Sequence, residues 1–403
     1  AFTIGSNTLS INGSITTTSG TLIGGSTSNI SIGGSGASTN LPAITLNNLT
    51  LNRSNGISLG GNVSVEGTLI LTSGTLTVGA TTLTILGNAP TRASGNIDSS
   101  AIGASLVFTN SSAILLPTSV FSGNTNNLTI NGAGITASND LTVDGILNLQ
   151  SANPSSVKGS LDMDTFTLNM GVSATTIGIG DVIGIVKRTH TFTGNIAYTF
   201  GNQNTSIDFA NVVGGIKPVW ISCKIAIGTA PSWRTEAINR VYSFAQDGTG
   251  TDRTVTRLHY LDSELHGAET DESKLVFWDA YPGPSFTNSF PRSKSNNNTT
   301  DNWIELTGMA IDFIATSTVL DVKQWGLSYS NVTKKTWTGN GSISFVGDWS
   351  LPGNWDGGVP LSTEDVLIPA TLPIDTHGYP TRNLNSGSVP AVAKTIEIEA
   401  GAS

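Results

Sequence analysis

Short apolar triplets with a polar residue in the middle recur through the first half of the chain. Because side chains alternate between two faces along a strand, the first and third residues of a triplet share one face. Each triplet therefore predicts a very short strand with two apolar side chains inward and one polar side chain outward. The clearest triplets are Leu49-Thr50-Leu51, Ile57-Ser58-Leu59, Val63-Ser64-Val65, Leu76-Thr77-Val78 and Leu83-Thr84-Ile85. Leu69-Ile70-Leu71 has the same spacing with an apolar middle residue.

The triplets repeat with a fixed period. Every third triplet lies about 20 residues further on, as from Leu49 to Leu69, which is typical of a coil with three strands per turn. Gly-Gly, Glu-Gly and Asn-Gly pairs stand between the triplets and permit tight corners. The pattern predicts a three-sided parallel β-helix over residues 1–201, with Ile177 and Ile179 as one of its later inward pairs.

Longer alternating runs begin after residue 201, where tryptophans and charges appear together, as in residues 219–227 and 253–260. Such runs, separated by turn-rich loops, predict an antiparallel β-sandwich over residues 202–335. A tryptophan-rich segment over residues 336–403 is predicted to start a second β-helix. The predicted fold class is therefore all-β: a three-sided parallel β-helix, an antiparallel β-sandwich and the start of a second β-helix.

Composition narrows the possible functions. Only 12% of the residues are charged, beside 46 glycines, and the net charge of −9 argues against binding to nucleic acid. No apolar run approaches the ~20 residues needed to span a bilayer, so no membrane span is expected. The single cysteine, Cys223, excludes an internal disulfide and is expected to be a buried small residue. The start at Ala1 suggests a processed or excised piece.

A spaced tryptophan motif follows residue 335. It consists of Trp337-Thr338-Gly339, Asp348-Trp349, Asn354-Trp355, Gly358-Val359-Pro360 and Asp365 to Pro369. The motif resembles one in very large, repetitive bacterial cell-surface proteins, the adhesin-like group that gliding bacteria export by type IX secretion. Those proteins also carry β-helical stretches and a sandwich. The resemblance implies an extracellular, cell-surface location and a structural or adhesive role.

Open β-helix strands are expected at both ends of the printed sequence. Phe2 and Ile4 lie in a first strand and Leu9-Ser10-Ile11 forms a second, with no capping segment before them, and Ile396 and Ile398 form an inward pair in a last strand. Open strand edges invite pairing with another strand, and solenoid ends need caps. We therefore predict an end-to-end junction at Phe2, Ile4, Ile396 and Ile398, with a neighbouring repeat or subunit of the same protein as the partner in a filament.

Carboxylates on the β-helix raise the alternative of a polysaccharide-degrading enzyme, since sugar-cleaving sites use paired carboxylates. The candidates are Asp140, Asp144, Asp162 and Asp164, followed by Lys187, Arg188 and His190. These carboxylates fall at predicted corners or on outward positions, which favours a structural role. No catalytic residue is predicted, and the protein is predicted not to be an enzyme.

An acidic loop over residues 262–272 offers the hard oxygen ligands that calcium prefers. Asp262, Glu264, Glu269 and Asp271 are the candidate ligands. Their spacing is not that of an EF-hand, and a solvated loop is the favoured interpretation. Calcium is the one candidate ion, and no other cofactor is expected.

Aromatic residues in the sandwich raise a second alternative, a carbohydrate-binding module on a passive stalk. Trp233 and Tyr281 lie beside proline-containing turns and are the candidates for stacking on surface glycans. The other sandwich tryptophans are expected to be mostly core residues. Trp337, Trp349 and Trp355 are expected to seal the start of the next β-helix.

Overall fold

The computed structural model describes residues 1–16, 18–150, 161–209, 216–247, 253–266, 271–280, 289–291, 294–310, 323–329, 335–339, 349–355, 359–360, 365–370, 372, 379, 393 and 395–399. This part of the chain is built from strands and contains no α-helix, and none of its helices is long and apolar enough to cross a membrane. Its short 3₁₀ helices are η1 (Asp262–Glu264), η2 (Glu272–Lys274) and η3 (Pro352–Asn354). The prediction of an all-β protein is confirmed.

The chain divides into two compact units. The first consists of Ala1–Thr189 with Gly201–Gln203, and the second of His190–Phe200 with Asn204–Ser403. The three-part division at residues 201 and 335 stays a prediction.

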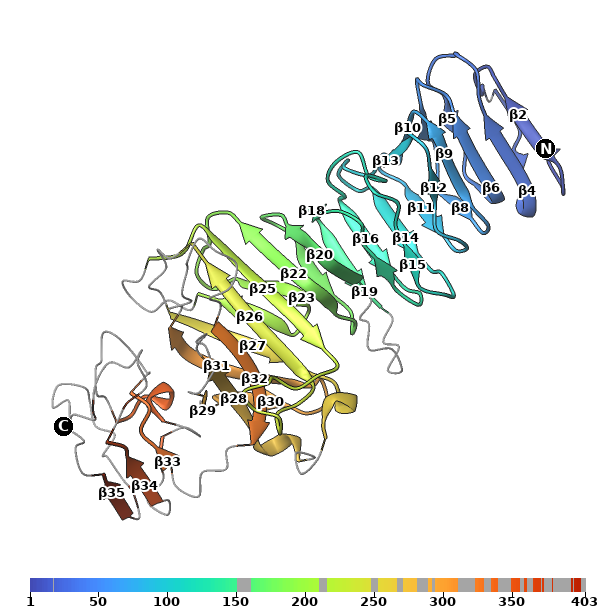
Figure 1. The fold of residues 1–403 in the computed structure, drawn as a ribbon. Helices are drawn as coiled ribbons and strands as arrows, with labels where there is room; N and C mark the ends of the chain where they lie inside the picture. The colour runs from blue at the N-terminus through green and yellow to red at the C-terminus, as the bar shows by residue number, and fades with distance from the viewer. Residues whose placement is uncertain are drawn as a thin grey trace. The chain divides into compact units, whose positions relative to one another are not determined.

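The first unit is a parallel β-solenoid of about eight turns, as predicted. Figure 1 shows its strands stacked in sequence order from blue to green. The largest sheet contains β2 (Thr8–Ile11), β4 (Gly25–Ile32), β6 (Ile44–Asn52), β8 (Val63–Val65), β9 (Leu69–Ser73), β11 (Thr82–Ile85), β12 (Thr91–Arg92), β14 (Ser105–Phe108), β16 (Asn127–Ile130), β19 (Ile146–Leu149) and β21 (Thr175–Ile177).

Smaller parallel sheets complete the coil. One contains β1 (Phe2–Thr3) and β3 (Leu22–Ile23). A second contains β5 (Asn40–Leu41), β7 (Ile57–Leu59), β10 (Thr75–Thr77) and β13 (Asn96–Asp98). A third set contains β15 (Ile114–Leu115), β17 (Ile135–Thr136), β18 (Leu141–Val143), β20 (Leu161–Met170) and β22 (Val182–Thr189).

Aligned apolar side chains run through the interior of the solenoid from rung to rung. Two inner ladders cover the first four rungs: Leu9, Ile30, Leu49 and Leu69, and beside them Ile11, Ile32, Leu51 and Leu71. A third ladder continues further along the chain through Ile44, Val63, Leu83, Leu106, Leu128 and Leu147. Burying each such side chain contributes about 1.5–3 kcal/mol, so the ladders are the main source of stability for the coil.

One predicted inward pair is wrong. Thr176, not Ile177, aligns with the inward Leu147, and Ile177 and Ile179 are both exposed. The reason is the conformation of Gly178, whose φ of +89° makes it a corner rather than the middle of a strand. The preceding rung sets the register of β21, and a shift of one residue exchanges the two faces.

Antiparallel sheets form the larger part of the second unit, as predicted. One contains β25 (Trp220–Ile227), β26 (Arg240–Gln246), β32 (Lys323–Tyr329), β28 (Leu275–Ala280) and β29 (Ser289–Pro291). The other contains β23 (Ala197–Asn202), β24 (Thr205–Asp208), β27 (Arg253–His259), β31 (Trp303–Ala310) and β30 (Asn296–Asn298).

The core of the second unit follows strand alternation. Ile221, Cys223 and Ile225 on β25 are buried, and burial raises the pKa of the Cys223 thiol. Trp325 is buried and packs edge-on against Phe277, with ring centroids 6.1 Å apart. Of the remaining sandwich tryptophans, Trp278 and Trp303 are buried, whereas Trp220 and Trp233 are half-buried.

A parallel three-stranded sheet lies in the last part of the chain: β33 (Lys335–Thr336), β34 (Asp365–Ile368) and β35 (Thr395–Ile398). Trp337 and Trp355 are fully buried with centroids 4.9 Å apart, and they form one core cluster with Val366 and Ile368 of β34. Trp349 packs against the same cluster. The three motif tryptophans therefore cover the apolar face of this sheet.

Candidate functional site at the first rung of the β-helix

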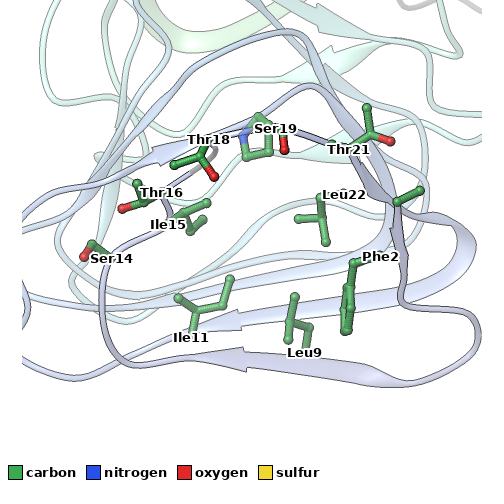
Figure 2. A pocket seen from close by; sticks show the side chains of 13 residues that line it. Phe2, Leu9, Ile11, Ser14, Ile15, Thr16, Thr18, Ser19, Thr21 and Leu22 are labelled. Carbon is green, nitrogen blue, oxygen red and sulfur yellow. The ribbon is translucent and has the colours of Figure 1, made fainter.

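An apolar hollow of about 500 Å³ opens at the first rung of the solenoid. Figure 2 shows its apolar side chains directed toward one another from β1, β2, β3 and the connecting loop. The lining residues are Ala1, Phe2, Leu9, Ile11, Ser14, Ile15, Thr16, Thr18, Ser19, Gly20, Thr21, Leu22 and Pro42. We call this hollow the first-rung hollow.

Strand β2 supplies the two central apolar side chains of the first-rung hollow. Leu9 and Ile11 begin the inner ladders, yet they are only half-buried, whereas Ile30 and Ile32 one rung further on are fully buried. Among the described strands, β4 is the one that pairs with β2, so one edge of β2 has no strand partner there. The interior of the solenoid is therefore uncovered at this rung.

The chemistry of the first-rung hollow is apolar with a rim of hydroxyls. Among the described residues that line it, none has a charged side chain, and Ser14, Thr16 and Thr21 contribute hydroxyl groups. Such a surface gains free energy when apolar area is removed from water. Among its described lining residues, none carries a carboxylate, imidazole or thiol group.

A second uncovered apolar pair lies on β35. Ile396 and Ile398 are 55% and 65% exposed, although they align with the buried Val366 and Ile368 of β34. Within the described residues, β34 is the strand that pairs with β35. β35 therefore also has an edge without a described partner, and it displays two apolar side chains spaced like those of β2.

The four residues of the predicted junction differ in exposure. Phe2 is 58% exposed and lines the first-rung hollow, and Ile396 and Ile398 are exposed as well, but Ile4 is buried. Leu9 and Ile11 were not among the predicted junction residues. Their alternation with Ser10 had already marked this strand as one without a cap.

The carboxylates considered for catalysis take part in corner contacts. Asp140 accepts a hydrogen bond from the Thr167 backbone N–H at 2.8 Å, and Asp144 accepts one from the Asn124 side chain at 2.8 Å. Asp162 accepts one from the backbone N–H of Asp164. The bonds of Asp140 and Asp144 lie next to strand ends, and that of Asp162 lies at the irregularity within β20.

The basic residues that follow on the chain are also engaged. Arg188 is buried and donates to the carbonyls of Gly171 and Ala174. The His190 ring packs against Phe192 and Tyr198, with centroids 4.5 and 5.1 Å away. Lys187 is half-buried on β22.

The candidate calcium ligands that the structure describes already have protein partners. Glu264 is buried and accepts hydrogen bonds from Arg240, with Nη2 2.8 Å from Oε1. Asp262 accepts a bond from the Asn302 side chain. Glu269 lies outside the described residues. Within the described part of the chain, no group of three acidic, histidine or cysteine residues is placed to hold a metal ion, and the calcium site stays a prediction.

Asp271, the fourth candidate, is bonded within its own turn. Its carboxylate accepts from Ser273 and lies 3.2 Å from the ammonium of Lys274. The Ser273 bond, followed by the Lys274 contact, lowers the pKa of Asp271.

Trp233, a candidate for glycan stacking, packs on strand β32 and is hydrogen-bonded to it. Its indole N–H donates to Gln324 at 2.9 Å, and its ring lies over Gly326, where a Cβ would stand 3.5 Å from the ring. The neighbouring Arg234 stacks on Trp278 at 3.6 Å. Tyr281 lies outside the described residues, so the glycan site stays a prediction.

Fold and site together define a parallel β-solenoid protein with an uncovered apolar first rung. No protein-family model matches the chain, and neither a curated protein nor a solved structure matches it.

Proposed function

We propose that this chain is a structural element of an extracellular bacterial surface fibre, in which the β-helix serves as a rod that is continued end to end. The observation that carries the proposal is the set of inner ladders that begin, half-covered, at Leu9 and Ile11. A further rung placed on β2 would extend these ladders without any change to the rungs that follow.

The bonding between rungs and the apolar interior support a mechanical role. Rung-to-rung hydrogen bonds and the apolar ladders stiffen the coil without disulfides, since the single Cys223 is buried. The resemblance to large repetitive cell-surface proteins supports an extracellular location, and adhesion to a surface is the second part of the proposed role.

Sedimentation velocity of the 403-residue chain over a range of protein concentrations tests the end-to-end continuation. We expect elongated oligomers whose size grows with concentration, visible as linear particles by electron microscopy. Leu9→Asp would place a charge in the first-rung hollow and should abolish this growth, because an unpaired carboxylate is costly to bury.

Ile102→Asp is the matched control, since Ile102 is 92% exposed in a turn and has no burial to lose. A wild-type chain that stays monomeric throughout, or equal loss of assembly in both variants, would contradict the proposed function.

A further inference from the structure

β2 and β35 each have one edge without a strand partner among the described residues, and these two edges have opposite senses. β4 follows β2 in the chain, so the free edge of β2 faces toward a preceding rung. β34 precedes β35, so the free edge of β35 faces toward a following rung. Both strands belong to parallel sheets. An edge that needs a preceding strand and an edge that needs a following strand are complementary.

The side chains on the two edges also match. Ile396 and Ile398 are two residues apart and lie on the face of β35 that is continuous with the buried Val366 and Ile368. Leu9 and Ile11 have the same spacing and lie on the face of β2 continuous with buried Ile30 and Ile32. Each pair is the uncovered end of an inner ladder.

From this match, and resting on the proposed end-to-end function, we propose that β35 of a second copy of this chain pairs in parallel with β2. Ile396 of that copy then faces Leu9, and Ile398 faces Ile11. Main-chain hydrogen bonds join the two strands, as in other cases of strand addition to a sheet edge. The contact is heterologous, because it uses two different surfaces, and it can therefore grow into an open filament.

Strand β2 fits this partner better than its neighbour β1 does. β1 and the residue after it offer one uncovered apolar side chain, that of Phe2, because Ile4 is already buried. β2 offers two at the required spacing. The lining of the first-rung hollow carries no charged side chain that would repel or select an ionic partner, which favours an apolar strand as the occupant.

Cysteine cross-linking tests the register directly. Ser10 lies between Leu9 and Ile11 and is exposed. The proposed pairing places it beside position 397 of the second copy, within the Cα separation of about 4.4–6.8 Å that a disulfide allows. A mixture of the S10C and E397C variants should form a disulfide-linked dimer under mild oxidation. The native Cys223 is buried and does not compete.

Thr8→Cys is the matched control, because Thr8 is exposed on the same face of β2 but lies two residues out of register. S10C with E397C should cross-link at least about tenfold more than T8C with E397C, since the latter separation exceeds the disulfide range. S10C alone should not form the dimer. Equal yields from both mixtures would overturn the proposal.

A second measurement does not depend on cysteines. Both isoleucines are more than half exposed in the single copy, so replacing them with I396S and I398S should leave the fold intact. Losing the burial of two such side chains should weaken assembly about 100-fold or more in dissociation constant. Ile102→Ser, at an exposed position in a turn, should leave assembly unchanged.

The outcomes separate the two proposals. If the wild-type chain does not assemble, the end-to-end function fails. If it assembles but neither the cross-link nor the serine variants behave as expected, the function survives and the pairing of β35 with β2 is overturned.

Discussion

Arg53 is a fully buried arginine whose bonding partners are backbone carbonyls. Its guanidinium donates to Gly33 at 2.9 Å, Ala37 at 3.2 Å, Gly13 at 2.6 Å and Ile11 at 3.2 Å. These carbonyls belong to two successive coils, and Arg53 belongs to the next. One side chain therefore connects the first-rung hollow to the two rungs behind it.

Arg53→Met should destabilise the beginning of the solenoid. The substitution keeps an apolar stem but removes the guanidinium's hydrogen bonds to four carbonyls, and each bond from a charged donor contributes about 1.5–3 kcal/mol. We expect the free energy of local unfolding of the first rungs to fall by about 3 kcal/mol or more. This change is measured as faster hydrogen exchange at the amides of Gly33 and residue 53. The Gly33 N–H donates to the Ile11 carbonyl and the Arg53 N–H donates to the Ser73 carbonyl, and these bonds join the first rungs.

Arg92→Met serves as the control for Arg53. Arg92 is half-buried and donates a long bond of 3.5 Å to Ser94. Its replacement should change hydrogen exchange little. Equal effects at the two positions would contradict the role given to Arg53.

Arg240 on β26 and Glu264 on η1 form a buried ion pair between two elements of the second unit. Arg240 bonds both carboxylate oxygens, and the Leu261 backbone N–H bonds Oε2 at 3.0 Å. Arg240 also approaches the hydroxyl of Tyr242 at 3.3 Å. The pair fastens the loop after β27 to the sheet containing β26.

Glu264→Gln should lower the unfolding free energy of the second unit by about 3–5 kcal/mol, because it leaves a buried guanidinium without its counter-charge. Tryptophan fluorescence measures this unit selectively, since all 8 tryptophans lie at or beyond Trp220. Replacing both members, R240M with E264L, should recover much of the loss. A double variant as unstable as the sum of the two single variants would argue against coupling.

At the scale of the whole molecule, the proposed junction rests on apolar contacts between Leu9, Ile11, Ile396 and Ile398, although β35 also contains Glu397, and each copy carries a net charge of −9. Self-association through the first-rung hollow should therefore persist at high salt. Raising NaCl from about 0.01 M to about 1 M shortens the Debye length from about 30 Å to about 3 Å. The dissociation constant from sedimentation should stay level or fall, because repulsion between copies is screened. A tenfold weakening would instead indicate an ionic contact.

The local alternation of Leu, Ile and Val with Thr and Ser was sufficient to predict the β-helix and the antiparallel sheets that follow. The face of each short strand is a property of a few adjacent residues. The same alternation correctly marked Leu49, Leu69 and Leu83 as inward. It failed at Ile177, because Gly178 makes a corner whose position depends on the rung beneath.

The candidate site was only partly predictable. Sequence alone selected Phe2, Ile396 and Ile398, which are exposed, but it also selected Ile4, which is buried, and omitted Leu9 and Ile11. Whether an inward residue is covered depends on the rung before and the rung after it. That information is absent from the residue's own strand.

The sequence by itself determined the kind of coil, its period and the apolar character of its interior, because these depend on two-residue alternation and on glycine at corners. The tertiary structure decided which apolar side chains are left uncovered, that Glu264 has Arg240 as its partner, and that the free edges of β2 and β35 are complementary. These features arise from contacts between residues distant in the chain, since burial and ion pairing depend on which surfaces the fold brings together.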